Sequence, residues 1–196
     1  YYRLASRGPH LGPPPLADSY PFYVLIESAG ADLEAEAGHF LDALSRATDL
    51  GLLQDAVLAQ SEKERAAFWA IRDNIESLAV LWPLAIFDIS LPLATMEDYL
   101  ERTGARLSQR LGELRWVTFG HLGDSNLHLA IALGGDDPDL RHAVEEIVYG
   151  ELAGIGGSVS AEHGIGLEKR EFLHCSRSAA EIELMKTLKR ALDPRN

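Results

Sequence analysis

The chain has 196 residues, a formal net charge of −12 and 46% hydrophobic residues. This length is typical of one ordinary domain with an apolar core, and the negative charge argues against a nucleic-acid partner. The single cysteine, Cys175, excludes an internal disulfide, and no apolar run approaches the roughly 20 residues of a membrane helix. We therefore expect a soluble, cytoplasmic enzyme rather than a secreted or membrane protein.

Both ends of the chain indicate a fragment of a longer protein. It begins at Tyr1 without a methionine, and it stops at residues 193–196 directly after a helical pattern. Residues 1–20 contain the run Gly-Pro-Pro-Pro at 12–15, which favours an irregular leader. The first regular element is therefore expected after residue 20.

The apolar pattern of residues 22–59 predicts a β-α-β unit. Residues 22–27 and 56–59 are short apolar runs typical of strands, and residues 33–44 repeat their apolar positions at helical spacing. Ser61 and Glu64 then form a capping-box pattern, which predicts the start of a second helix.

The second half of the chain predicts three further strands, at residues 87–92, 116–119 and 127–133, the last two joined by a turn. Helices are expected from Thr95 and from Pro138, and two short helices close the chain. The predicted fold is α+β: a ferredoxin-like antiparallel sheet with helices on one face and a small C-terminal helical piece. We assign residues 21–156 to this domain and residues 157–196 to a separate loop and helices.

Two histidines flank the predicted hairpin turn, seven positions apart. A turn centred on Asp124 and Ser125 would pair His121 with His128 across the hairpin. Directly opposed residues have Cβ atoms about 4.5–5.5 Å apart, which lets two imidazoles bind one ion. From spacing alone, two unrelated histidines at a turn remain an equal alternative.

A second segment, residues 156–166, places Glu162 and His163 between small residues. Glycines at 164 and 166 predict a close approach of the backbone. His121, His128 and Glu162 would form a site with open coordination positions, as metal catalysis requires, and His163 would stay free as a base. Zinc is the first expectation, and manganese or iron also suits these ligands.

The two segments, Gly-His-Leu-Gly-Asp-Ser-Asn-Leu-His at 120–128 and Ser-Ala-Glu-His-Gly-Ile-Gly at 160–166, resemble the C-terminal domain of the FAD-linked oxidases. That family includes D-lactate, D-2-hydroxyglutarate and glycolate dehydrogenases. The resemblance extends from the segment at residue 22 through Trp-Ala-Ile-Arg at 69–72 to the last residues of the chain. It implies a domain that covers a flavin bound mainly by a preceding FAD-binding domain, which this chain lacks.

The resemblance also implies roles for individual residues. His121, His128 and Glu162 would be metal ligands, and His163 would accept the substrate proton beside the flavin. Arg72 would bind the substrate carboxylate, and His163 and Asn196 would contact the cofactor. The implied reaction is oxidation of a small D-2-hydroxy acid to the 2-oxo acid, with electrons passing from FAD to an unidentified acceptor.

Three positions depart from the family pattern. Ile86 stands where relatives often carry lysine, and Ala130 stands where they often carry asparagine, so we expect this chain to lack two polar substrate contacts. Ser125 replaces a turn glycine, a mild change unless the backbone there needs a positive φ. These departures leave the substrate open, and the sequence also leaves the oligomeric state open, a homodimer included.

Two other functions fit the same residues. A flavin-independent hydrolase could use the metal site to activate water, with His163 as the base. A non-catalytic interaction module is conceivable because of Ile86 and Ala130. The isolated chain is expected to be inactive under the leading hypothesis, because the resemblance places the flavin mainly on a domain that this chain lacks. Consistent with this, the chain carries no strand followed by a G-x-G-x-x-G turn.

Overall fold

The computed structural model describes residues 1–8 and 10–195. The chain forms two compact units, Tyr1–Leu78 and Ala79–Asn196. The domain boundaries expected from the sequence, at residues 20 and 156, are a different division and stay predictions. Within the described part of the chain, no helix is both long and apolar enough to cross a membrane.

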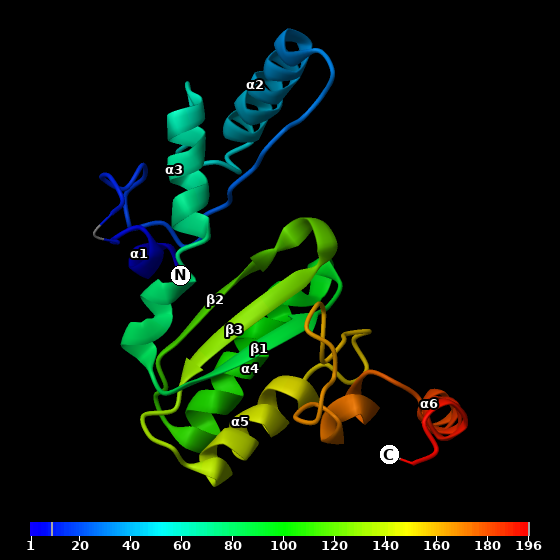
Figure 1. Ribbon diagram of the computed structural model, residues 1–196. Coiled ribbons are helices and arrows are strands. Elements are labelled where there is room, and N and C mark those ends of the chain that lie inside the picture. Colours follow the sequence, from blue (N-terminus) through cyan, green and yellow to red (C-terminus); the bar gives the residue numbers. More distant parts are fainter. Residues whose placement is uncertain (9, 196) are drawn as a thin grey trace. The chain divides into compact units, whose positions relative to one another are not determined.

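The N-terminal unit contains the helices α1 (Tyr2–Ala5), α2 (Leu33–Asp49) and α3 (Glu62–Arg72) (Figure 1). The predicted start of α3 is confirmed, because the Ser61 hydroxyl accepts the backbone N–H of Glu64 at 3.2 Å. The Glu64 carboxylate accepts from the N–H of Gln60 at 2.6 Å, one residue before the helix cap. The expected irregular leader contains one helical turn, α1, before its first proline.

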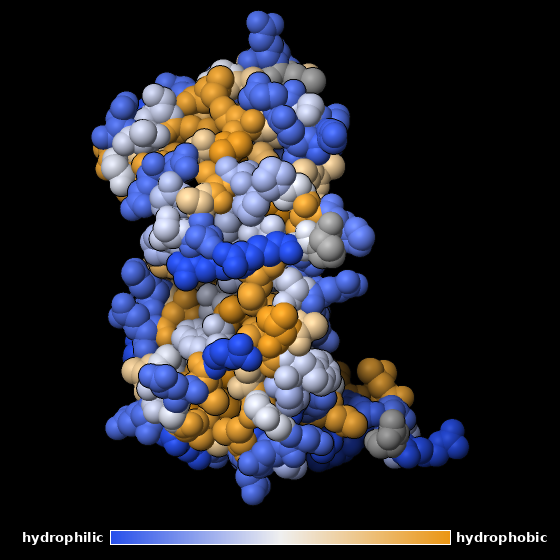
Figure 2. All heavy atoms as spheres, turned by 90° about the vertical axis from the view of Figure 1, so that its left-hand side faces the viewer, coloured by the Kyte–Doolittle hydropathy of each residue, from blue (hydrophilic) through white to orange (hydrophobic). Residues whose placement is uncertain are grey.

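The β-α-β unit expected over residues 22–59 is wrong, because only its helix forms. Residues 22–27 and 56–59 are not strands, and Phe22 and Val24 are 75% and 60% exposed. Figure 2 shows apolar side chains gathered on the surface of this unit. An apolar, β-branched run becomes a strand only where a neighbouring strand takes up its backbone hydrogen bonds, and local composition cannot supply that neighbour.

The C-terminal unit is built on an antiparallel sheet of β1 (Leu84–Ser90), β2 (Trp116–His121) and β3 (Asn126–Ala132) in the order β1-β3-β2. The helices α4 (Met96–Leu111) and α5 (Pro138–Gly150) cover one face (Figure 1). A single antiparallel bridge joins Ser158 to Ser90 on the outer edge of β1. This β-α-β-β-α arrangement confirms the predicted α+β class, although it begins at β1 rather than at residue 22.

The sheet separates an apolar face from a polar one because side chains alternate along each strand. Phe87, Ile89, Leu129 and Ile131 point to the helices and belong to the buried core with residues such as Tyr99. The intervening residues of each strand lie on the face without helices. That second face carries the histidines of the candidate site.

The remaining elements are four 3-10 helices and one α-helix among the described residues. The 3-10 helices are η1 (Ile75–Leu81), η2 (Leu93–Thr95), η3 (Leu122–Asp124) and η4 (Glu171–Cys175). The helix α6 (Ala179–Leu192) follows, and a capping box of Ser178 and Glu181 fixes its start. The helical piece predicted at the C-terminus is confirmed by η4 and α6.

Candidate metal centre

The hairpin of β2 and β3 brings the two motif histidines to one face of the sheet. The predicted register is wrong: His121 pairs with Asn126, and His128 pairs with Phe119. The connection is longer than a two-residue turn, because η3 and Ser125 together fill positions 122–125. A shift of two residues preserves the face, so the imidazoles are diagonal neighbours with ring centroids 5.6 Å apart.

Two backbone features fix this hairpin. A Cβ added at Gly120 would lie 2.3 Å from the carbonyl oxygen of Asn126, so the two strands approach too closely for any side chain at that position. Ser125 adopts φ 61° and ψ 24°, a left-handed conformation. The backbone therefore does need a positive φ at Ser125, at a cost of about 1–2 kcal/mol for a non-glycine residue.

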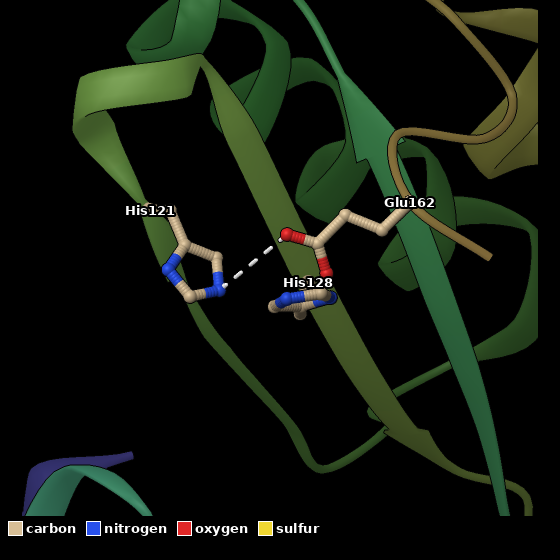
Figure 3. A group of neighbouring side chains, drawn as sticks. All are labelled: His121, His128 and Glu162. Carbon is tan, nitrogen blue, oxygen red and sulfur yellow. Dashed lines mark ion pairs between the residues drawn. The ribbon is translucent and has the colours of Figure 1, made fainter.

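Glu162 approaches the two histidines from the loop that follows α5. The Nε2 atom of His121 lies 3.9 Å from Oε1 of Glu162, and one ligand atom from each of the three residues lies within 4.8 Å of the others. Figure 3 shows the three side chains pointing toward one another from two strands and this loop. The sequence therefore predicted correctly which residues would come together.

This arrangement fits a divalent ion. Donor atoms around a tetrahedral zinc ion with bonds of about 2.0–2.2 Å lie about 3.3–3.6 Å apart. The observed limit of 4.8 Å exceeds this by a little over 1 Å, which rotations of the side chains would remove on binding. Two imidazoles and one carboxylate also leave coordination positions for a substrate.

The glycines after Glu162 serve a different purpose from the one expected. Gly164 and Gly166 have φ values of 77° and 55°, and a Cβ at either position would meet nothing within 4 Å. Their role is the left-handed backbone rather than a close approach. They turn the chain directly after Glu162 and His163.

Asp88 lies at the centre of the site, and sequence reasoning left it out. Its side chain is 1% exposed, and Oδ2 accepts the backbone N–H groups of Glu162 at 2.9 Å and His163 at 2.8 Å. Nδ1 of His128 lies 3.8 Å from Oδ1 of Asp88. The only signal in the sequence was an aspartate between the apolar residues Phe87 and Ile89, which also fits a solvent-facing strand position.

Burial and the charged groups around Asp88 together shift three pKa values. Burial alone would raise the pKa of Asp88, but the N–H donors of His163 and Glu162 and the Lys169 ammonium lower it overall. Burial lowers the pKa of His128, and the Asp88 carboxylate opposes that shift. Burial also lowers the pKa of Lys169, whose Nζ lies 3.8 Å from Oδ2 of Asp88. His128 is therefore biased toward the neutral form that can bind a metal.

The other predicted site residues are placed as follows. His163 is 62% exposed in its side chain, and its ring lies 6.2 Å from that of His128 between centroids. Arg72 belongs to the N-terminal unit, where its guanidinium pairs with Asp73 at 2.8 Å, the surface pairing typical of such a helix position. Its substrate role stays a prediction. Asn196 lies outside the described residues.

The fold and the site define an α+β domain with a candidate metal centre on the open face of its sheet. The family model described as FAD linked oxidases, C-terminal domain, matches residues 8–196. The chain belongs to this family.

Three curated relatives show how the chain compares with whole proteins. It is 38% identical to the mitochondrial D-2-hydroxyglutarate dehydrogenase of Bos taurus over 95% of this chain and 34% of that protein. It is 35% identical to a putative mitochondrial D-lactate dehydrogenase of Schizosaccharomyces pombe, over 92% of the chain and 36% of that protein. It is 36% identical to the D-2-hydroxyglutarate dehydrogenase of Xanthomonas citri, over 92% of the chain and 39% of that protein. The chain thus spans between a third and two fifths of these relatives.

Proposed function

We propose that the chain is the substrate- and metal-binding domain of a flavin-dependent dehydrogenase that oxidises a small D-2-hydroxy acid to the 2-oxo acid. The observation that carries the proposal is the convergence of His121, His128 and Glu162 beside His163 in a member of the FAD-linked oxidases. Relatives named as D-2-hydroxyglutarate and D-lactate dehydrogenases support the substrate class. The FAD-binding part would be a separate domain that precedes this one.

His121, His128 and Glu162 would hold the divalent ion, with zinc as the first choice. When bound, the ion would make the substrate hydroxyl more acidic, and the flavin would supply the acceptor for the hydride of the substrate carbon. The chain itself has to bind the acid, orient its hydroxyl and remove one proton. Arg72 would bind the carboxylate through two parallel hydrogen bonds once the domains are assembled.

His163 would be the proton acceptor. Its Nδ1 lies 3.7 Å from Oδ2 of Asp88, which favours a proton on Nδ1 and leaves Nε2 as the basic atom. The ring is exposed, so a substrate can reach Nε2. Removal of such a base typically slows a reaction by about 10²–10⁴-fold.

The face of the sheet around the histidines has a polar end and an apolar end. Ser90 and His121 flank Asn126 in the row of paired residues at the turn, whereas Ile86 and Val117 flank Ala130 four positions further along the strands. Asn126 is 2% exposed, and neither polar atom of its side chain has a hydrogen-bond partner among the residues described. It lines a cavity of about 140 Å³ with Ser90, Asp124, Ala161 and Glu162.

This polarity supports one orientation of the substrate. The polar hydroxyl and carboxylate end would face Asn126, and the carbon substituent would lie against Ile86, which is 51% exposed, beside the fully buried Ala130. Burial of an apolar substituent at that end is favourable, whereas a second carboxylate there would lose hydration without a partner. We therefore propose an acid with a small apolar substituent.

The proposal is tested with the flavoprotein that contains this chain, loaded with zinc or manganese and kept anaerobic. A 2-hydroxy acid should bleach the visible flavin absorbance, and His163→Ala should slow the bleaching by at least a hundredfold while the metal stays bound. The matched control His142→Ala changes an exposed histidine of α5 and should bleach at the normal rate. Failure of every 2-hydroxy acid to bleach the metal-loaded flavin would contradict the proposal.

The same experiment addresses the second candidate function. A flavin-independent hydrolase would use the same three ligands and His163 to activate water. It would turn over esters or amides with metal alone and would leave the flavin oxidised. The electron acceptor, a cytoplasmic location and self-association as a homodimer remain predictions from the sequence.

A further inference from the structure

We infer that Asp88 is the positioning residue that assembles the candidate centre. The inference rests on the proposed function, because it concerns the same three ligands. A single buried carboxylate reaches the strand that carries His128 and the loop that carries Glu162 and His163. Asp88 lies 40 positions before His128 and 74 and 75 positions before Glu162 and His163, so no local structure could fix their spacing.

One oxygen of Asp88 holds the loop. Oδ2 accepts two consecutive backbone N–H groups, from Glu162 and His163, at 2.9 and 2.8 Å. The Ser160 hydroxyl lies 3.4 Å from the same oxygen. Because one charged oxygen binds both N–H groups, it fixes the backbone orientation of Glu162 and His163 and so the direction of both side chains. The same carboxylate oxygen of Asp88 therefore positions a proposed metal ligand and the proposed proton acceptor.

The other oxygen faces His128. Oδ1 is buried and has no hydrogen-bond partner within the described part of the chain, and it lies 3.8 Å from Nδ1 of His128. A shift of less than 1 Å would form the Nδ1–H···Oδ1 hydrogen bond. An imidazole with its proton on Nδ1 presents Nε2 to a metal, and a carboxylate behind it fixes both the tautomer and the ring orientation.

Lys169 balances the charge of Asp88. Its Nζ lies 3.3 Å from the backbone oxygen of Asp88 and 3.2 Å from the Ser160 hydroxyl, and its side chain is 12% exposed. A buried carboxylate without a nearby cation would be costly and would favour protonation. The ammonium therefore lets Asp88 remain an anion in a buried position.

The test compares Asp88→Asn with Asp98→Asn in the full chain. Both remove one carboxylate charge without changing side-chain size, but Asp98 is an exposed residue of α4. Zinc affinity is measured by competition with a chelator, and the exchange of the Glu162 and His163 amide hydrogens is measured by NMR. We expect Asp88→Asn to weaken zinc binding 10- to 100-fold and to speed both amides at least tenfold, and Asp98→Asn to change neither.

The two measurements separate the inference from the proposed function. Zinc binding within threefold of wild type, with unchanged amide exchange in Asp88→Asn, would overturn the role of Asp88 and leave the metal centre intact. A wild-type chain that binds no zinc would contradict the metal centre, and the amide exchange would still decide whether Asp88 holds the loop. If Asp88→Asn does not fold, slow exchange of the two amides relative to Gly164 in the wild type supports the role, and equal exchange overturns it.

Discussion

Gly120→Ala should destabilise the sheet at the point where the hairpin presents His121. The added Cβ would lie 2.3 Å from the carbonyl oxygen of Asn126 and 3.0 Å from Cα of Leu127. Ordinary contact begins near 3.4 Å, so β2 must move away from β3 by about 1 Å, the difference between 3.4 and 2.3 Å. Overpacking of this kind costs about 1–3 kcal/mol, and a weakened ladder hydrogen bond adds about 1 kcal/mol. We expect a loss of about 2–4 kcal/mol.

Gly123→Ala is the matched control for this variant. Gly123 lies in η3 between the same two strands, and a Cβ there would meet nothing within 4 Å. Its free energy of unfolding should stay within about 0.5 kcal/mol of wild type. Both variants are compared by urea denaturation followed by circular dichroism. Equal stability of Gly120→Ala and Gly123→Ala would refute the close approach of β2 and β3.

Three other predictions follow from the same structure. Ser125→Gly should relieve about 1–2 kcal/mol of left-handed backbone strain and lose about 0.4–1 kcal/mol because the unfolded chain becomes more flexible. The free energy of unfolding, measured by urea denaturation, should therefore rise by about 0.5–1 kcal/mol. A fall would contradict the left-handed conformation of Ser125. Burial alone would raise the pKa of Glu151, but hydrogen bonds from two arginines of α4 lower it overall. The ionised Glu151 therefore stabilises the folded protein above the unfolded pKa of about 4.3, and this contribution is lost as the pH falls through the folded pKa. Glu151→Gln should therefore cost about 1 kcal/mol at pH 7 and less as the pH falls below the unfolded pKa, and a cost that stays the same as the pH falls would argue against the ion pair. In the flavoprotein, Ile86→Lys should raise the ratio of kcat/KM for a dicarboxylic 2-hydroxy acid to that for a monocarboxylic one at least tenfold. The control Ile86→Leu should leave this ratio unchanged. An unchanged ratio in Ile86→Lys would show that the carbon substituent of the substrate does not lie against residue 86.

The sequence predicted most of the helices and the three strands of the sheet. Local signals decide such elements: Ser61 caps α3, Asp137 caps α5, and alternating apolar residues mark β1. The segments at 22–27 and 56–59 carry the same apolar signal but form no strand. A strand depends on a distant partner, and no periodicity within six residues contains that information.

The sequence identified the three side chains that converge but not how they are held. The spacing predicted that His121 and His128 lie on one face of the sheet. They do so despite a register error of two residues, because side chains alternate between the two faces with period two. The register depends on the left-handed conformation of Ser125, which the sequence does not predict because residues other than glycine seldom adopt it. Asp88 was missed because its partners are backbone N–H groups about 75 residues away.

The most direct test of the account is the metal content of the full chain. After chelator treatment and reloading with zinc or manganese, mass spectrometry should find about one equivalent in the wild type and in the control His142→Ala, and almost none in His121→Ala and Glu162→Ala. This pattern would establish the three residues as ligands of one ion. A wild-type chain that stays empty, or both ligand variants that keep their metal, would contradict the proposed centre.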